Sequence, residues 1–254
     1  MRVARTETFT VHTYEVDAFQ ALAAPALAGY LQEVAGLHAA DMGCGIEALR
    51  ERGLTWVLSR QRIEIDLPVA VGDSLEVATW PAGVDRLFAL RDFEVTRKTG
   101  ERVARASTCW LVMDLAKRRP VRPDRVLSPE YLAPLGQALP PSPAIAAVET
   151  PDAERAFRIR YADIDHNLHV TNTTYLGWAL ESVSEETWRN WRLSSVEVHF
   201  LAECVYGSRV LSRVRGRPEG EVLHGILREE DGRELARIST RWQRRLPAGV
   251  AAPP

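Results

Sequence analysis

Polar and apolar residues follow two different periods along the first forty residues of the chain. From Phe9 to Glu15 the pattern alternates residue by residue, which is typical of a strand with one buried face. From Pro25 the period becomes helical, and the apolar residues that share one broad stripe are Leu27, Tyr30, Leu31, Val34 and Leu37. Strand-like runs return after Gly53, at 55–67, 74–80, 86–97 and 101–115. The pattern predicts one helix followed by an antiparallel meander.

The same order of elements returns in the second half of the chain. A strand begins at Phe157, and a helix is expected from about Thr173 to Trp188. Strand-like runs follow at 194–203, 208–216, 222–230 and 234–245. The pair Asp231-Gly232 between the last two runs is a strong signal for a hairpin turn.

The two halves are also similar residue by residue. The matched segments are 9–34 with 157–182, at an offset of 148, and 100–110 with 232–242, at an offset of 132. Asp17 thereby falls on Asp165. Matched segments in a fixed order indicate a duplicated unit. We expect an α+β protein with two such units, each a long helix wrapped by a curved antiparallel sheet, and we expect the two sheets to join edge to edge.

The chain between the copies is rich in proline. Residues 126–154 hold six of the 15 prolines, and a proline cannot donate a hydrogen bond to a β ladder. We therefore expect a first repeat at 1–125, a proline-rich linker that wraps the surface at 126–154, a second repeat at 155–246, and a tail at 247–254.

The composition is that of an ordinary globular protein, and it argues against several classes. Of the 254 residues 46% are hydrophobic and 26% are charged, and a net charge of −2 gives no reason to expect nucleic-acid binding. The N-terminus has no apolar signal core, and no apolar run reaches the roughly 18 residues of a membrane span. The three scattered cysteines, Cys44, Cys109 and Cys204, do not suggest a disulfide framework. We expect a cytoplasmic protein.

The copies differ where a polar loop precedes the second helix. Asn167 and His169 stand where the first copy has Phe19 and Ala21. If the strand continues through Asp165, then Asp165, Asn167 and His169 point the same way, while Ile164 and Leu168 seat the loop. Thr171 or Asn172 could cap the helix that follows, whose free N–H groups can polarise a carbonyl oxygen. This arrangement suits acyl transfer.

A second difference between the copies lies at Glu203-Cys204. With Gly72 aligned to Gly207, these two residues fall on Pro68 and Val69. A carboxylate at the end of an apolar strand is costly unless it is paired or used, and the histidine loop is its nearest plausible partner.

Structural interpretations of these residues stay open. The role of Asp165 could be limited to forming the turn of the loop, as the role of Asp17 would be in the copy that lacks the histidine. Cys204 could be a small buried hydrophobic residue. The polar cluster is too compact to suggest a metal site, so we expect neither a metal nor a cofactor.

Several segments resemble fatty acyl-acyl carrier protein thioesterases. Residues 163–182, DIDHNLHVTNTTYLGWALES, resemble the family signature D-x-N-x-H-V-N-N-x-x-Y-x-x-W-x-x-E-S, and 196–204, VEVHFLAEC, resemble its segment ending in a catalytic Glu-Cys pair. Residues 31–43, 55–65 and 96–119 resemble the family's N-terminal half. The chain departs from the pattern at Thr171, where the family usually has Asn, and at Thr173-Thr174.

The resemblance implies a tandem hotdog fold and hydrolysis of the thioester between a fatty acyl chain and acyl carrier protein. By motif position Asp165, Asn167, His169 and Glu203 form the catalytic group, with Cys204 as a possible nucleophile. We favour attack by water, with Glu203, or His169 oriented by Asp165, as the base and with Asn167 and the helix-start amides holding the carbonyl. The alternative is attack by Cys204 with His169 as base.

Three functions stay open at this point. The second repeat would catalyse hydrolysis of the acyl carrier protein thioester, with the first repeat as the acyl-chain pocket. The alternatives are a hotdog thioesterase acting on acyl-CoA and a non-catalytic acyl-binding module. Acyl carrier protein is the expected partner, and a tandem chain could be a monomer or a homodimer.

Overall fold

The computed structural model describes residues 4–133, 136–140 and 143–245. These residues form two compact units, Met1–Pro143 and Ala144–Pro254. Over the described ranges, no helix combines the length and the apolar character needed to cross a bilayer.

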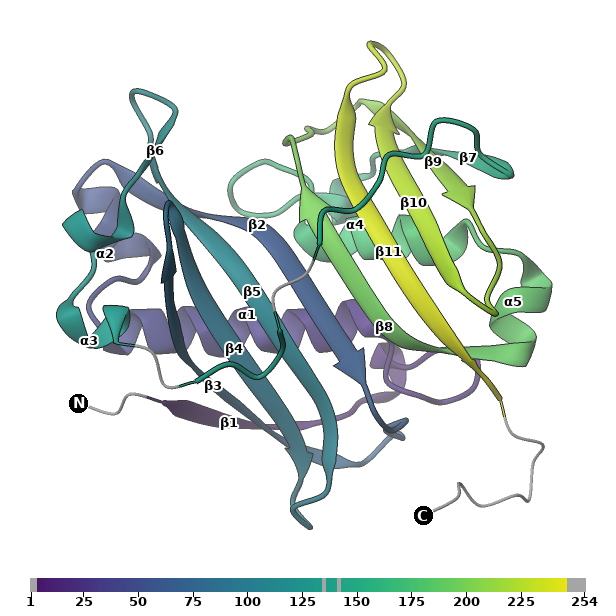
Figure 1. Ribbon diagram of the computed structural model, residues 1–254, viewed down its shortest axis with the longest axis horizontal. Helices are drawn as coiled ribbons and strands as arrows, with labels where there is room; N and C mark the ends of the chain where they lie inside the picture. The colour runs from purple at the N-terminus through teal and green to yellow at the C-terminus, as the bar shows by residue number, and fades with distance from the viewer. Residues whose placement is uncertain (1–3, 134–135, 141–142, 246–254) are drawn as a thin grey trace. The chain divides into compact units, whose positions relative to one another are not determined.

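The first unit is a long helix against a five-stranded antiparallel sheet (Figure 1). Its sheet order is β1-β3-β4-β5-β2. The short strand β6 pairs antiparallel with the end of β5 and forms a hairpin with it. The elements are β1 (Arg5–Thr10), a 3-10 turn (Thr13–Glu15), α1 (Ala24–Asp41), α2 (Ile46–Glu51), β2 (Leu54–Ile65), β3 (Ser74–Asp85), β4 (Phe88–Arg97), β5 (Arg102–Asp114), β6 (Arg119–Val121), a 3-10 turn (Pro123–Arg125) and α3 (Pro129–Leu132).

The second unit repeats this topology. Its sheet order is β7-β9-β10-β11-β8, so each strand occupies the place of its counterpart in the first unit. The elements are β7 (Ala153–Arg158), a 3-10 turn (Tyr161–Asp163), α4 (Asn172–Glu181), α5 (Glu185–Asn190), β8 (Trp191–Phe200), β9 (Arg209–Arg215), β10 (Glu221–Arg228) and β11 (Glu234–Arg244). The duplication read from the sequence is therefore also a duplication of strand order.

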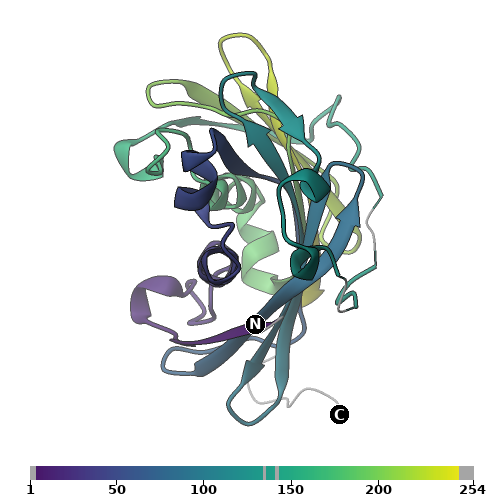
Figure 2. The ribbon, with the colours of Figure 1, turned by 90° about the vertical axis from the view of Figure 1, so that its left-hand side faces the viewer.

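The long helix α1 follows the predicted apolar stripe. Pro25 lies in its first turn, where its missing N–H removes no helical hydrogen bond. Leu27, Tyr30, Leu31 and Val34 are buried as expected. Figure 2 looks nearly along α1 and shows the strands of its own unit curving around it. Gly43 ends the helix with a positive φ of 70°, a conformation that glycine adopts without steric cost.

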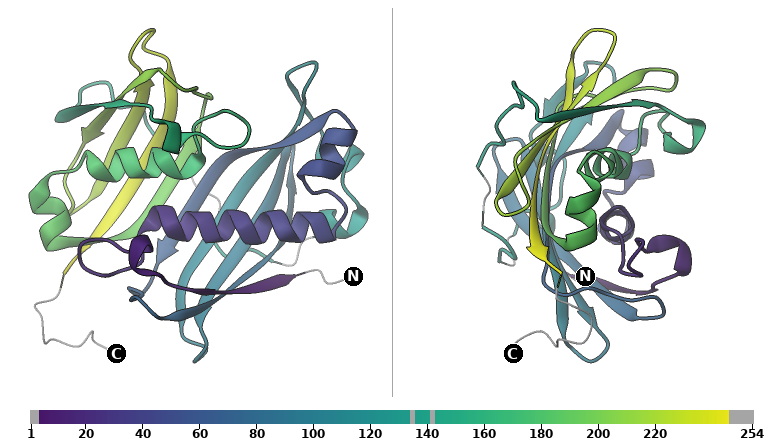
Figure 3. Two further views of the ribbon diagram at one scale, coloured as in Figure 1. Left: turned by 180° about the vertical axis from the view of Figure 1, so that it is seen from behind. Right: turned by 90° about the vertical axis from the view of Figure 1, so that its right-hand side faces the viewer.

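The second helix differs from the prediction. A single helix from about Thr173 to Trp188 was expected, but α4 ends at Glu181 and α5 begins at Glu185 (Figure 3). Two serines account for the break. The hydroxyl of Ser182 donates to the carbonyl of Trp178 at 2.7 Å, and that of Ser184 accepts from the backbone N–H of Thr187. Serine side chains compete in this way with helical hydrogen bonds.

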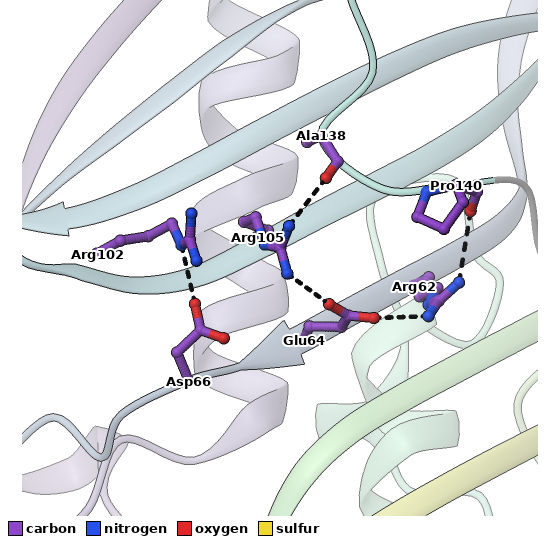
Figure 4. A network of polar contacts seen from close by, with 7 residues as sticks. All are labelled: Arg62, Glu64, Asp66, Arg102, Arg105, Ala138 and Pro140. Atoms are coloured by element: carbon purple, nitrogen blue, oxygen red, sulfur yellow. Dashed lines mark hydrogen bonds and ion pairs between the residues drawn. The ribbon is translucent and has the colours of Figure 1, made fainter. Parts of the chain in front are cut away.

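The first part of the proline-rich segment packs on the first unit. Arg105 and Arg62 donate to the carbonyls of Ala138 and Pro140, each at 3.4 Å. Both guanidinium groups also contact the carboxylate of Glu64, so a polar network on β2 and β5 holds this part of the chain (Figure 4).

Helix α3, which precedes that contact, contributes a buried aromatic side chain. Tyr131 is 2% exposed, and its ring stacks on Trp56 with 6.0 Å between the ring centroids. The buried guanidinium of Arg91 lies over the Tyr131 ring and also contacts Nδ1 of His38 on α1 at 2.8 Å. The chain after β6 thus belongs to the core of the first unit as well as to its surface.

The later part of the same segment packs on the second unit. Arg237 donates to the carbonyl of Ile145 at 3.2 Å, and both Ile145 and Val148 are buried. The boundary between the two compact units therefore lies within the proline-rich segment.

Candidate active site

The polar loop before α4 is a closed turn rather than an extended strand. Strand β7 ends at Arg158, and the backbone N–H of Asp165 donates to the carbonyl of His169 at 2.8 Å. Leu168 has a positive φ of 63° and is 75% exposed. The expected continuation of the strand through Asp165 is therefore wrong, and so is the expectation that Leu168 seats the loop. The geometry of the turn, rather than the alternation of a strand, sets the directions of the side chains in this loop.

The carboxylate of Asp165 builds this turn. Its Oδ1 accepts hydrogen bonds from the backbone N–H groups of Asn167 at 2.8 Å and His169 at 3.2 Å, and its Oδ2 lies 3.5 Å from Nδ2 of Asn167. In the first unit Asp17 makes the same two backbone contacts, with Phe19 and Ala21. Asp165 therefore has a structural role that both copies share, and it orients Asn167 and His169 through their backbone.

The turn brings His169 to Glu203. Nε2 of His169 lies 3.2 Å from Oε2 of Glu203, with the two side chains 41% and 47% exposed. A β-bridge between His169 and Val205, and a 2.9 Å hydrogen bond from the N–H of Val170 to the carbonyl of Cys204, tie the two loops together. An imidazole and a carboxylate at this distance, both open to solvent, can exchange a proton with each other and with a bound water.

Cys204 is placed differently from its neighbour. It is 1% exposed, and over the described part of the chain its thiol forms no hydrogen bond, including none with His169. Its counterpart Val69 is also buried, and the N–H of Leu22 donates to the carbonyl of Val69 just as Val170 does to that of Cys204. The sulfur thus occupies the place of a buried aliphatic side chain.

Thr171 is the residue that precedes the first turn of α4. Its backbone is extended and its side chain makes no capping hydrogen bond. The N–H of Thr171 donates instead to the carbonyl of Asp163, and Ala23 and Glu15 make the same contact in the first unit. The first-turn N–H groups of α4 thus start directly behind the histidine turn, where they can polarise a carbonyl oxygen.

The corresponding place in the first unit is apolar. A cavity of about 20 Å³ is lined there by Leu22, Leu27, Pro68 and Val69, among others. A space of this size holds about one water molecule. No acid–base pair stands at these positions, so this unit keeps the loop geometry without the reactive side chains.

Tyr175, a residue that the sequence analysis did not single out, lies beside the site. Its ring is 2% exposed and packs edge to face with Trp178 and Phe200. Burial raises the pKa of the Tyr175 phenol, and electrostatic interactions with Cys204 and Glu203 raise it further. The signal was available in the alignment of the two copies, where Tyr175 falls on Leu27.

Family models match almost the whole chain. The acyl-ACP thioesterase N-terminal domain matches residues 3–134, and the acyl-ACP thioesterase C-terminal domain matches residues 147–244. This chain belongs to the acyl-ACP thioesterase family. The family boundary, like the boundary between the compact units, falls in the proline-rich segment.

Individual members of the acyl-ACP thioesterase family show the same relationship over nearly the full length. The oleoyl-acyl carrier protein thioesterase 1 of Arabidopsis thaliana is 28% identical over 94% of this chain and 76% of its own length. The structure of an acyl-ACP thioesterase from Bacteroides thetaiotaomicron superposes with a TM-score of 0.83 at 27% identity, covering 94% of this chain and 98% of that one.

The 12:0-ACP thioesterase from Umbellularia californica has the same fold. It superposes with a TM-score of 0.85 at 24% identity and covers 96% of this chain and 99% of its own. The tandem hotdog fold expected for an acyl-ACP thioesterase is thus confirmed, and each of the two units described above is one hotdog repeat.

The shared turn gives a test of the role of Asp165 in this acyl-ACP thioesterase family member. Asp17→Ala and Asp165→Ala each remove two backbone hydrogen bonds from equivalent turns, so we expect each to lower Tm by about 2–5 °C. Only Asp165→Ala should also slow thioester hydrolysis, because only that turn carries His169. Scanning calorimetry and a thiol-release assay measure the two effects. Equal loss of activity in both variants would contradict this role.

Proposed function

We propose that this protein is a hydrolase that releases a fatty acid from acyl carrier protein, and that its second unit carries out the reaction. The observation that carries the proposal is the 3.2 Å contact between His169 and Glu203, in a chain that belongs to the acyl-ACP thioesterase family. Ala21 and Pro68 stand at the corresponding positions of the first unit, and neither can transfer a proton.

The proposed reaction is direct attack by water. Glu203 takes a proton from a bound water, and the hydroxide oxygen forms a bond to the thioester carbonyl carbon. When the tetrahedral intermediate breaks down, the C–S bond cleaves and protonated His169 gives its proton to the leaving sulfur. The proton held by Glu203 then returns to His169 across their 3.2 Å contact, and both groups regain their starting states.

Hydrogen-bond donors near the turn are proposed to stabilise the negative charge that develops on the thioester carbonyl oxygen. The side-chain amide of Asn167 and the first-turn N–H groups of α4 are preorganised before the substrate binds, because Asp165 fixes the turn and Thr171 starts the helix. Donors that are fixed in advance lower the barrier without reorganising during the reaction.

Attack by the thiol of Cys204 is less well supported. The general base of a nucleophilic cysteine must lie within hydrogen-bond reach. Cys204 is buried where its counterpart is Val69, and within the described residues its thiol has no hydrogen bond to His169. The geometry therefore favours water as the nucleophile and a packing role for Cys204.

The first unit is proposed to bind the acyl chain. It keeps the helix and sheet but places apolar residues around the equivalent of the catalytic position. The cavity there holds about 20 Å³, which is too small for a fatty acyl chain, so binding in this cavity requires the side chains that line it to move apart.

A comparison of carriers tests the proposed function. The full-length chain is given acyl thioesters of acyl carrier protein and of CoA that bear the same acyl chain, in a series of graded chain lengths, and free thiol is measured. We expect kcat/KM for the acyl carrier protein thioester to exceed that for acyl-CoA by at least about tenfold. His169→Ala is the matched blank.

Two outcomes would contradict this function. If kcat/KM for acyl-CoA equals or exceeds kcat/KM for the acyl carrier protein thioester, the protein is an acyl-CoA thioesterase. Tight binding of the acyl group with no thiol release above that of His169→Ala would make it an acyl-binding module.

A reducing cytoplasm is the proposed setting. Cys44, Cys109 and Cys204 are all free thiols, and Cys44 and Cys204 are buried in different units. A framework of disulfides, which stabilises many exported proteins, is not part of this fold.

A further inference from the structure

Tyr175 stands at a position where the two copies of the fold diverge, next to the positions of the reactive groups. In the first unit its counterpart is Leu27, and Leu27 lines the same apolar cavity as Pro68 and Val69. Those two residues are the counterparts of Glu203 and Cys204. The change from leucine to tyrosine therefore adds a hydroxyl group at the place where the second unit also gains a carboxylate.

The hydrogen bonds that surround this place are the same in both units, which supports the equivalence. Leu22 donates to the carbonyl of Val69 at 2.8 Å, and Val170 donates to the carbonyl of Cys204 at 2.9 Å. The helix that carries Leu27 or Tyr175 begins directly after each of these contacts. The position of Tyr175 relative to the loop of Glu203 is thus fixed by backbone geometry.

The ring of Tyr175 is held firmly, whereas its hydroxyl has no partner. Trp178 and Phe200 pack against the ring edge to face, with centroid distances of 5.4 and 5.7 Å. Across the described ranges of the chain, the phenol oxygen forms no hydrogen bond with another residue. The oxygen is not fully buried, so its hydrogen bond is available to water or to a bound substrate.

The electrostatic surroundings keep this hydroxyl protonated. Burial is the main cause of the raised pKa of the Tyr175 phenol. Electrostatic interactions with Cys204, Glu203 and Asp165 raise it further, and Arg228 lowers it. A phenol in this environment is a hydrogen-bond donor at neutral pH and has no tendency to act as a base.

We propose that Tyr175 is a catalytic residue whose hydroxyl donates a hydrogen bond to the carbonyl oxygen of the bound thioester. It would complement the amide of Asn167 and the first-turn N–H groups of α4 as negative charge builds on that oxygen. Before substrate binds, the donor has no partner among the described residues. The rigid packing of the ring means that little reorganisation is needed when the substrate arrives. The inference rests on the proposed thioester hydrolysis.

Tyr175→Phe tests this inference because it removes only the hydroxyl. Removal of one such donor costs about 10²–10³ in kcat in other acyl-transfer enzymes. We expect kcat for the acyl carrier protein thioester to fall about a hundredfold, with KM changed by less than about threefold. Tm should stay within about 2 °C of wild type, since the hydroxyl has no partner in the fold. Tyr175→Leu, which restores the residue of the first unit, should lose at least as much kcat.

Tyr30→Phe is the matched control. Tyr30 lies on α1 in the first unit, and its hydroxyl donates to Oε2 of Glu15 at 2.6 Å. Loss of this hydroxyl should lower Tm and leave kcat unchanged, the opposite pattern to that of Tyr175→Phe.

The results separate failure of the inference from failure of the proposed function. If wild type releases thiol and Tyr175→Phe has the same kcat, the inference is overturned while the function stands. If Tyr175→Phe lowers kcat but also lowers Tm as much as Tyr30→Phe does, the hydroxyl has a structural role. That result would also overturn the inference. If wild type releases no thiol, the proposed function itself fails.

Discussion

Replacing Glu203 by glutamine is expected to slow thioester hydrolysis by about 10²–10⁴, the contribution typical of a general base. Glutamine has the same shape and keeps an oxygen toward Nε2 of His169, so the 3.2 Å contact and the loop need not change. It cannot accept a proton from water. The loss should therefore appear in kcat rather than in KM, as measured by thiol release from the acyl carrier protein thioester.

Cys204→Val provides the control for this prediction, because valine is the residue that the first unit places at the corresponding position. The buried site of Cys204 should accept the valine side chain without strain, and activity should stay within about threefold of wild type. Attack by the thiol would be abolished by this substitution. An inactive Cys204→Val protein that folds normally, together with an active Glu203→Gln protein, would establish the cysteine as the nucleophile instead.

Comparison of the two copies predicted much of the fold. The expected meander holds only for β3-β4-β5 and β9-β10-β11, because β2 pairs with β5 and β8 pairs with β11. The offset of 148 residues placed α1 and α4 at equivalent positions, and the strand-like runs located the strands that follow each helix. These predictions succeeded because apolar periodicity reports which face of an element is buried, and both units bury the same faces. The fold class was therefore readable without any knowledge of the site.

Local chain geometry was harder to predict than the fold. The loop from Asp165 to His169 was considered as the continuation of a strand, but the carboxylate of Asp165 folds it into a turn by accepting two backbone hydrogen bonds. Leu168 adopts a positive φ, which its sequence position does not indicate because leucine rarely takes this conformation. Likewise, the serines that end α4 and begin α5 lie within an apolar period that continues across the break.

The candidate site itself was predictable only where a side chain changes between copies. Asn167, His169 and Glu203 were found in this way, and the structure brings His169 and Glu203 into contact. Asp165 is the same in both copies, and the turn explains why. Tyr175 also changes, but a tyrosine on the buried face of a helix is indistinguishable from a core residue until its neighbours are known.

His224 should make this protein less stable in acid. Its imidazole is 0% exposed on β10, its Nε2 lies 2.9 Å from the hydroxyl of Thr240, and its Nδ1 has no partner among the described residues. Burial lowers the pKa of His224 to about 3. The counterpart in the first unit is Phe93, since Phe93 pairs with Ala106 as His224 pairs with Ile238, at the offset of 132. The second unit thus keeps an uncharged imidazole where the first has a phenyl ring.

The sign of the effect follows from the two pKa values. Below the ordinary histidine pKa of about 6.5, the unfolded chain binds a proton at residue 224 and the folded chain does not. The free energy of unfolding therefore falls as the pH is lowered from about 6.5 toward 3, with a slope from this group of up to about 1.4 kcal/mol per pH unit. Above pH 6.5 the histidine is neutral in both states and contributes no pH dependence.

His224→Phe is expected to remove this contribution, because it restores the side chain of the first unit and has no titratable group. Urea unfolding at pH 7 and at pH 4.5 measures the slope for wild type and variant. Other acid-sensitive groups, such as Asp163 with its lowered pKa, act equally in both proteins, so the difference between them isolates His224. His12→Phe, a change at an exposed histidine, should keep the wild-type slope. The same acid dependence in His224→Phe and wild type would show that this imidazole gains a proton without unfolding the second unit.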